Sequence, residues 1–146
     1  MRRVTCTLST FGFMGMPAPA VQAYWYIPRL DHGEWVLFLI DTGASATCLN
    51  GIHALGLQQN MRLNTLTDSF GIGGNSQYYN ERAVIVFKDD DGQLLARRVQ
   101  IGIQQIQLQH LNNPNTLLCP SLLGRDILYF CKLNHHPPKN ITLEFQ

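Results

Sequence analysis

The stretch Leu39-Ile40-Asp41-Thr42-Gly43-Ala44-Ser45 decides how this sequence is best interpreted. An aspartate follows directly on the apolar run Trp35–Ile40, which predicts a strand covered on both faces. A charge at the end of such a strand must either be paired or have its pKa raised. Thr42 adds a hydroxyl, and Gly43 permits a tight turn with close backbone approach. Taken alone, the tripeptide could simply be a strand that ends in an Asp-Thr-Gly turn, so the rest of the chain has to decide.

The composition predicts one compact domain. The chain has 146 residues, of which 45% are hydrophobic and 14% charged, enough for a core without metal or disulfide support. A formal net charge of +1 gives no electrostatic reason to expect nucleic acid or an anionic membrane as partner, and no apolar run is long enough to span a bilayer. Four scattered cysteines without a CxxC pair favour buried thiols in a reducing compartment, so we expect a cytoplasmic protein.

Two other interpretations of local segments are weaker. The first 23 residues resemble a signal peptide that ends at Val21-Gln22-Ala23, but polar residues interrupt its apolar segment, and cleavage there would cut through a predicted strand. Cys131, His135 and His136 could be taken for zinc ligands, yet one thiol and two adjacent histidines lack the rest of a ligand set. We expect neither a metal nor another cofactor.

Short β segments separated by turn residues run through the whole chain. They predict an all-β domain, a small closed or half-closed barrel over residues 20–146, preceded by an extension of residues 1–19 that contains a strand. The only convincing helix is Arg125–Leu133, and at most one helical turn is expected over Ile52–Leu57. The predicted strands are Val4–Phe13, Ala20–Ile27, Glu34–Ile40, Arg82–Lys88, Gln93–Ile103, Leu117–Cys119 and Ile141–Phe145.

Two further segments carry motifs. Phe70-Gly71-Ile72-Gly73-Gly74 is typical of a hairpin tip with one apolar contact point, and its spacing does not fit a dinucleotide fingerprint. Leu122-Leu123-Gly124-Arg125-Asp126 is typical of a strand end that leads into a helix. Neither segment alone indicates a function.

Together and in this order, the three motifs resemble those of the retropepsin family of aspartic proteases, over roughly residue 20 to the end of the sequence. The resemblance implies the single-lobe acid-protease fold, a closed β-barrel with a glycine-rich flap hairpin and one short C-terminal helix. The segment Ile141–Phe145 is similar to the terminal strand with which retropepsin subunits interleave.

The resemblance also implies roles for individual residues. It makes Asp41 the catalytic carboxylate, with Thr42 bracing the active-site loops across the dimer and Gly43 contacting substrate backbone. It implies that the flap encloses a peptide substrate, that apolar pockets accept hydrophobic side chains around the scissile bond, and that a structural motif supports the loop. The substrate-binding residues would be Leu39, Ala44, Ser45, Ala46, Cys48, Gly71, Ile72, Gly73, Gly74 and Leu122, and the structural motif Gly124, Arg125 and Asp126.

One aspartate implies two chains. Hydrolysis by this chemistry needs two carboxylates about 3 Å apart that share one proton, and Asp-Thr-Gly occurs once here. The second carboxylate would therefore be Asp41 of another copy, around a two-fold axis, with no nucleic acid or membrane partner. Two alternatives stay open: a catalytically silent dimerisation or peptide-binding module of the same fold, and a β-barrel binder of unrelated function.

The sequence departs from the retroviral pattern at Ser45. Retroviral enzymes typically have an acidic residue there, which pairs with the arginine equivalent to Arg125. Serine cannot make that ion pair, so Arg125 must find another acceptor, either a backbone carbonyl or a neighbouring carboxylate.

Overall fold

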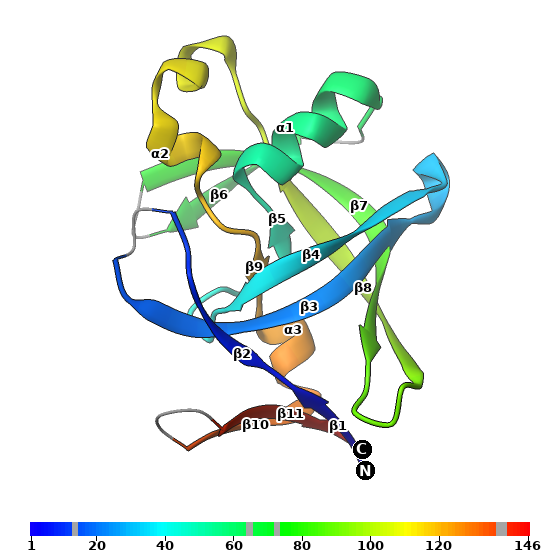
Figure 1. Cartoon of the computed structure of the whole chain (residues 1–146). Coiled ribbons are helices and arrows are strands. Elements are labelled where there is room, and N and C mark those ends of the chain that lie inside the picture. Colours follow the sequence, from blue (N-terminus) through cyan, green and yellow to red (C-terminus); the bar gives the residue numbers. More distant parts are fainter. Residues whose placement is uncertain (13–14, 64–65, 72–73, 137–139) are drawn as a thin grey trace.

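Strands dominate the computed structural model, which describes residues 1–12, 15–63, 66–71, 74–136 and 140–146 (Figure 1). The strands are β1 (Arg2–Thr5), β2 (Thr7–Thr10), β3 (Pro17–Ile27), β4 (His32–Ile40), β5 (Cys48–Leu49), β6 (Leu66–Gly71), β7 (Gly74–Lys88), β8 (Leu94–Gln104), β9 (Leu122–Leu123), β10 (Cys131–His136) and β11 (Asn140–Phe145). The helices are α1 (Gly51–Asn60), α2 (Pro114–Leu117) and α3 (Arg125–Leu128), with 3₁₀ turns η1 (Pro28–Leu30) and η2 (Leu108–Asn112). None of these described helices is both long and apolar enough to cross a bilayer.

The main sheet closes on itself. Its strand order is β2-β3-β4-β9-β5-β8-β7-β6, and β3 pairs with β7 as well as with β4. In this order the six strands β3, β4, β9, β5, β8 and β7 therefore form a ring (Figure 1). Outside the ring, β2 pairs with β3 and β6 pairs with β7. The predicted all-β fold class is confirmed.

The core fills the ring because alternate side chains of each strand point inward. On β3 and β4 the inward residues include Trp25 and Phe38, both essentially inaccessible to solvent. The prediction that β4 is covered on both faces is wrong: on its outer face Trp35 is 52% exposed, and Leu37 and Leu39 are half-buried. An unbroken apolar run looks the same whether its second face is covered or only partly shielded.

A smaller sheet closes one end of the ring. Its order is β1-β11-β10, all antiparallel, and α3 lies between it and the main sheet (Figure 1). The inward residues of β11 are Ile141, Leu143 and Phe145, all fully buried, and the Phe145 ring packs on Phe87 with centroids 5.2 Å apart. The small sheet is thus part of the hydrophobic core.

Several predicted boundaries need correction. The helix expected over Arg125–Leu133 ends at Leu128, because residues 131–136 instead pair with β11 along its whole length. The strand expected at Leu117–Cys119 begins inside helix α2, which ends at Leu117, and the segment pairs with no described strand. The single turn expected at Ile52–Leu57 is the ten-residue helix α1.

The N-terminal prediction needs correction as well. The strand expected over Val4–Phe13 is two strands that join different sheets, β1 and β2, and its last residue lies outside the described residues.

Replacing Phe145 tests whether β11 belongs to the core of its own chain. We expect Phe145→Ala to lower the free energy of unfolding by about 3–5 kcal/mol, because it leaves a cavity against Phe87. Urea denaturation followed by circular dichroism measures this. Leu94→Ala, at a side chain 65% exposed, is the control and should change stability by no more than about 0.5 kcal/mol. Equal effects of the two substitutions would contradict the placement of β11.

Candidate functional site

The loop that carries Asp41 continues from β4 beside a parallel neighbour. Leu39 and Ile40 of β4 lie opposite Leu122 and Leu123 of β9. The backbone N–H of Asp41 donates to the carbonyl oxygen of Leu123 at 3.0 Å, so the hydrogen-bond ladder extends one residue beyond the strand. The position of Asp41 is therefore fixed by a neighbouring strand as well as by its own.

Backbone donors orient the Asp41 carboxylate. The N–H of Gly43 donates to Asp41 Oδ1 at 2.8 Å, and the N–H of Ala44 donates to the Asp41 carbonyl at 3.2 Å. The side chain is half-buried, and no arginine, lysine or histidine of the described residues forms an ion pair with it. In the described part of the chain Oδ2 accepts no hydrogen bond, so this oxygen can accept one from water, substrate or a second carboxyl group.

The start of α3 holds the other side of the loop. The N–H of Arg125 donates to the Ala44 carbonyl at 2.9 Å, and its Nη1 donates to the Thr42 carbonyl at 3.1 Å. The acceptor that Ser45 cannot provide is therefore a backbone carbonyl. Position 124 must be glycine, because a Cβ there would lie 2.6 Å from the carbonyl carbon and oxygen of Ala46.

A buried threonine ties the loop to α3. The N–H of Thr47 donates to Asp126 Oδ2 at 3.0 Å and its hydroxyl donates to Oδ1 at 2.7 Å. The same hydroxyl accepts from the N–H of Gly124 at 3.1 Å. Both oxygens of Asp126 are thus engaged in structure. Thr47 was not predicted from the sequence, because no local pattern distinguishes a buried threonine from an ordinary loop residue.

Three of the predicted pocket residues form a row across the sheet. Leu39 on β4 lies opposite Leu122 on β9, which lies opposite Cys48 on β5, so their side chains share the outer face of the ring. Leu39 and Leu122 are half-buried, whereas Cys48 is buried, and this burial raises the pKa of its thiol to about 12. The loop residues Ala44, Ser45 and Ala46 follow Asp41 and are partly or fully exposed.

The glycine-rich motif falls at the end of a hairpin. β6 and β7 pair antiparallel, and their last pair is Gly71 with Gly74. Ile72 and Gly73 lie outside the described residues. The hairpin expected from the sequence is present, and its action as a flap stays a prediction.

A serine and a histidine meet beside the same strands without forming a second reactive centre. Ser121 Oγ lies 3.0 Å from His53 Nδ1 and accepts from the N–H of Asn50 at 3.0 Å. Ser121 is fully buried, so no substrate can reach its hydroxyl, and burial lowers the pKa of His53. This network anchors the start of α1 to the segment before β9.

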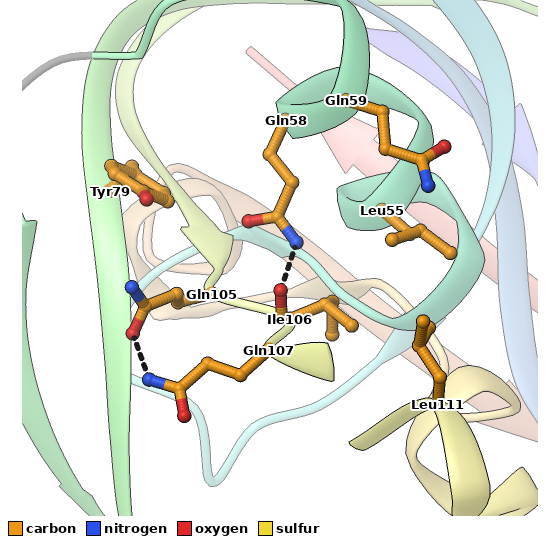
Figure 2. Close-up of a pocket in the computed structure, with 8 residues that line it drawn as sticks. All are labelled: Leu55, Gln58, Gln59, Tyr79, Gln105, Ile106, Gln107 and Leu111. Atoms are coloured by element: carbon orange, nitrogen blue, oxygen red, sulfur yellow. Dashed lines mark hydrogen bonds between the residues drawn. The ribbon is translucent and has the colours of Figure 1, made fainter. Parts of the chain in front are cut away.

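A cleft of about 300 Å³ lies beside α1 (Figure 2). In it, Gln58 Nε2 donates to the Ile106 carbonyl and Gln107 Nε2 donates to Gln105 Oε1. The described side chains that line the cleft carry no carboxylate, imidazole or thiol; they are Leu55, Gln58, Gln59, Tyr79, Gln105, Ile106, Gln107 and Leu111. Within the described residues, no three His, Cys, Asp or Glu side chains gather as metal ligands would. The Asp41 loop is therefore the candidate active site.

Comparisons with known proteins find a likeness in structure and none in sequence. No protein-family model matches the chain, and no curated protein sequence matches it. Among solved structures, it is similar to the EIAV protease complexed with the inhibitor HBY-793. The two share 21% sequence identity at a TM-score of 0.45, over 83% of this chain and 92% of that chain.

Removing the Thr47 hydroxyl tests how the loop is held. We expect Thr47→Val to lower the free energy of unfolding by about 1–3 kcal/mol, because it removes one hydrogen bond to Asp126 and leaves the N–H of Gly124 without its acceptor. Thr47→Ser keeps the hydroxyl and is the control. Chemical denaturation of the two variants decides, and a valine variant as stable as the serine variant would refute this account of the loop.

Thiol labelling tests the burial of Cys48. We expect iodoacetamide near pH 7.5 to leave Cys48 unmodified in the folded protein, since the thiolate is the reactive form and burial disfavours it. Peptide mass spectrometry before and after unfolding measures this. A cysteine introduced by Ser45→Cys, in the exposed loop that precedes β5, should react readily; comparable labelling of both sites in the folded state would be the contrary result.

Proposed function

We propose that this chain is one subunit of a homodimeric aspartic endopeptidase, with Asp41 of each copy forming a single active site. The observation that carries the proposal is the Asp41 carboxylate itself. It is half-buried, oriented through Oδ1 by the N–H of Gly43 and without an ion-pair partner among the described residues. A carboxylate that serves only structure is usually engaged by cations or several donors, as Asp126 is by Thr47.

The need for a second copy follows from the count of carboxylates. The other aspartate of the three motifs, Asp126, has both oxygens bonded to Thr47, so its carboxylate is engaged in holding the loop. Asp-Thr-Gly occurs once in the sequence. Two carboxylates about 3 Å apart cannot both be ionised, and this lets one act as base while the other acts as acid. A two-fold axis beside Asp41 supplies that pair.

The chemistry needs no covalent intermediate. The ionised Asp41 takes a proton from a water, whose oxygen attacks the peptide carbonyl carbon, while the protonated Asp41 of the other copy donates to the carbonyl oxygen. When the tetrahedral intermediate collapses, the carbon–nitrogen bond breaks and a carboxyl group returns a proton to the leaving amine. The loop that Arg125 and Gly124 hold would keep the two carboxylates at a fixed separation.

The substrate class follows from the surroundings of the loop. Leu39 and Leu122 present apolar, half-buried side chains next to Asp41, which favours hydrophobic residues around the scissile bond. The hairpin that ends at Gly71 and Gly74 would close over an extended peptide and pair with its backbone. The substrate is then an unstructured or exposed polypeptide segment.

Removing the charge of Asp41 is the first test. We expect Asp41→Asn to lower cleavage of an unstructured protein substrate by at least about a thousandfold between pH 3 and 7, because the base is lost. Asp31→Asn is the matched control: it replaces an exposed aspartate in a left-handed turn that asparagine also tolerates. If neither wild type nor variant cleaves at concentrations where the chain is dimeric, and both bind peptide equally, the chain is instead a peptide-binding module.

Mixing wild type with Asp41→Asn tests the shared site. If chains exchange freely, a one-to-one mixture should contain only about one quarter wild-type dimers, because assembly is random. Half of the wild-type chains are then in mixed dimers, which lack one Asp41 carboxylate. Activity per wild-type chain should therefore fall to about half of its unmixed value. Initial rates over a range of mixing ratios measure this. Activity proportional to the wild-type concentration alone would show that each chain works independently.

A further inference from the structure

The strand expected to interleave with a partner is already paired on both sides. β11 lies between β1 and β10 of its own chain, with four residue pairs on one side and six on the other. Ile141–Phe145 therefore has no free edge to offer, and the expectation that this segment interleaves between subunits is not supported by the structure. A dimer must use another edge or face.

The outer edge of β1 is covered by the turn between β7 and β8. The N–H of Thr5 donates to Asp90 Oδ1 at 2.9 Å, and the N–H of Asp90 donates to the Arg3 carbonyl at 2.8 Å. Arg2 Nε donates to Asp89 Oδ2 at 2.9 Å on the same side. These bonds occupy the groups that an added strand would need.

The outer edge of β10 is open in the described part of the chain. The N–H of Cys6 donates to the Ile141 carbonyl, so the odd-numbered residues of β11 direct their backbone groups toward β1 and the even-numbered ones toward β10. By the register, the even-numbered residues of β10 face β11. The N–H and C=O groups of Cys131, Leu133 and His135 therefore point away from the sheet, and no described strand pairs with them.

An exposed aromatic pair adjoins this edge. Tyr129 and Phe130, which connect α3 to β10, are 77% and 68% exposed. Soluble proteins usually protect open edges with charges, prolines or bulges; β10 has a single such residue, Lys132, and no proline. An open edge beside two exposed aromatic rings has the features of a protein interface. The same short α3 binds the Asp41 loop through Arg125, so the edge is connected to the site that needs a second copy.

We propose that β10 pairs antiparallel with β10 of a second copy, around the same two-fold axis that brings the two Asp41 loops together. The position of the two-fold axis rests on the proposed function, and the choice of the contacting surface rests on the open edge of β10. The register with the most hydrogen bonds puts Leu133 opposite the partner's Leu133. The two small sheets then form one continuous sheet across the dimer, with Tyr129 and Phe130 packed at its margin. No terminal strand crosses between subunits, so each subunit keeps a complete fold when the dimer dissociates.

Amide hydrogen exchange of the wild type tests the pairing without a substitution. At concentrations where sedimentation shows a dimer, the amides of Leu133 and His135 should be protected, and dilution to monomer should remove this protection. The amide of Asn134, which faces β11, is the internal control and should stay protected throughout. Exchange of Leu133 and His135 that is equally fast in dimer and monomer overturns the proposal.

Paired substitutions test the edge and the aromatic margin. His135→Pro removes an outward N–H and should weaken the dimer at least tenfold in dissociation constant, whereas His135→Ala keeps the N–H and should not. Phe130→Asp should weaken the dimer as well, and Ile52→Asp, at a side chain 66% exposed on α1, should not. Sedimentation velocity and circular dichroism measure assembly and folding. If His135→Pro does not fold, Phe130→Asp and the amide exchange decide.

The outcomes separate this inference from the proposed function. A wild type that dimerises and cleaves, with β10 amides unprotected and Phe130→Asp still dimeric, overturns the β10 interface and leaves the protease intact. A wild type that stays monomeric at every concentration and never cleaves overturns both. Concentration-dependent protection of Leu133 and His135 in a protein that dimerises but does not cleave supports the interface and refutes the enzyme.

Discussion

The backbone contact between Gly124 and Ala46 is the constraint on which the candidate site depends. No side chain fits between them, so the junction of β9 and α3 lies directly against the Asp41 loop. That closeness allows Arg125 to reach two loop carbonyls and Asp126 to bind Thr47 through backbone and hydroxyl together. The loop is thus held mainly by a segment about 80 positions further along the chain. A rigid loop is what a pair of carboxylates shared between two subunits requires.

The site divides its charged groups between two tasks. Arg125 and Asp126 both bond to the backbone of the loop, and Arg125 forms no ion pair with Asp41. Asp41 receives one backbone donor on one oxygen, and its other oxygen accepts no bond within the described residues. The small sheet completes the core of its own subunit. Among the described strands its β10 edge has no partner, and this edge lies beside the helix that holds the loop. Catalytic pairing and subunit assembly would then depend on one short helix.

Sequence patterns predicted those parts of the molecule that local chemistry determines. The apolar run before Asp41, the Asp-Gly turn that ends at Gly92 and the glycines at 71 and 74 all lie where turn and strand preferences put them. The predictions that failed concern contacts between segments far apart in the sequence. β10 has the sequence Cys-Lys-Leu-Asn-His-His, with no strand pattern, and is a strand because β11 pairs with it. For Arg125 the sequence left a backbone carbonyl and a carboxylate as alternative acceptors, and the structure shows the carbonyl of Thr42. The role of Thr47 could not be predicted, because its partners are set by the contact at Gly124.

In the enzyme that we propose, two chains build one active site. Isothermal titration calorimetry tests this with a peptide whose scissile amide is replaced by a hydroxyethylene group, a mimic of the tetrahedral intermediate. We expect one inhibitor bound per two chains, with binding lost in Asp41→Asn because the carboxylate no longer meets the hydroxyl. One inhibitor per chain, or equal affinity of wild type and Asp41→Asn, would contradict it.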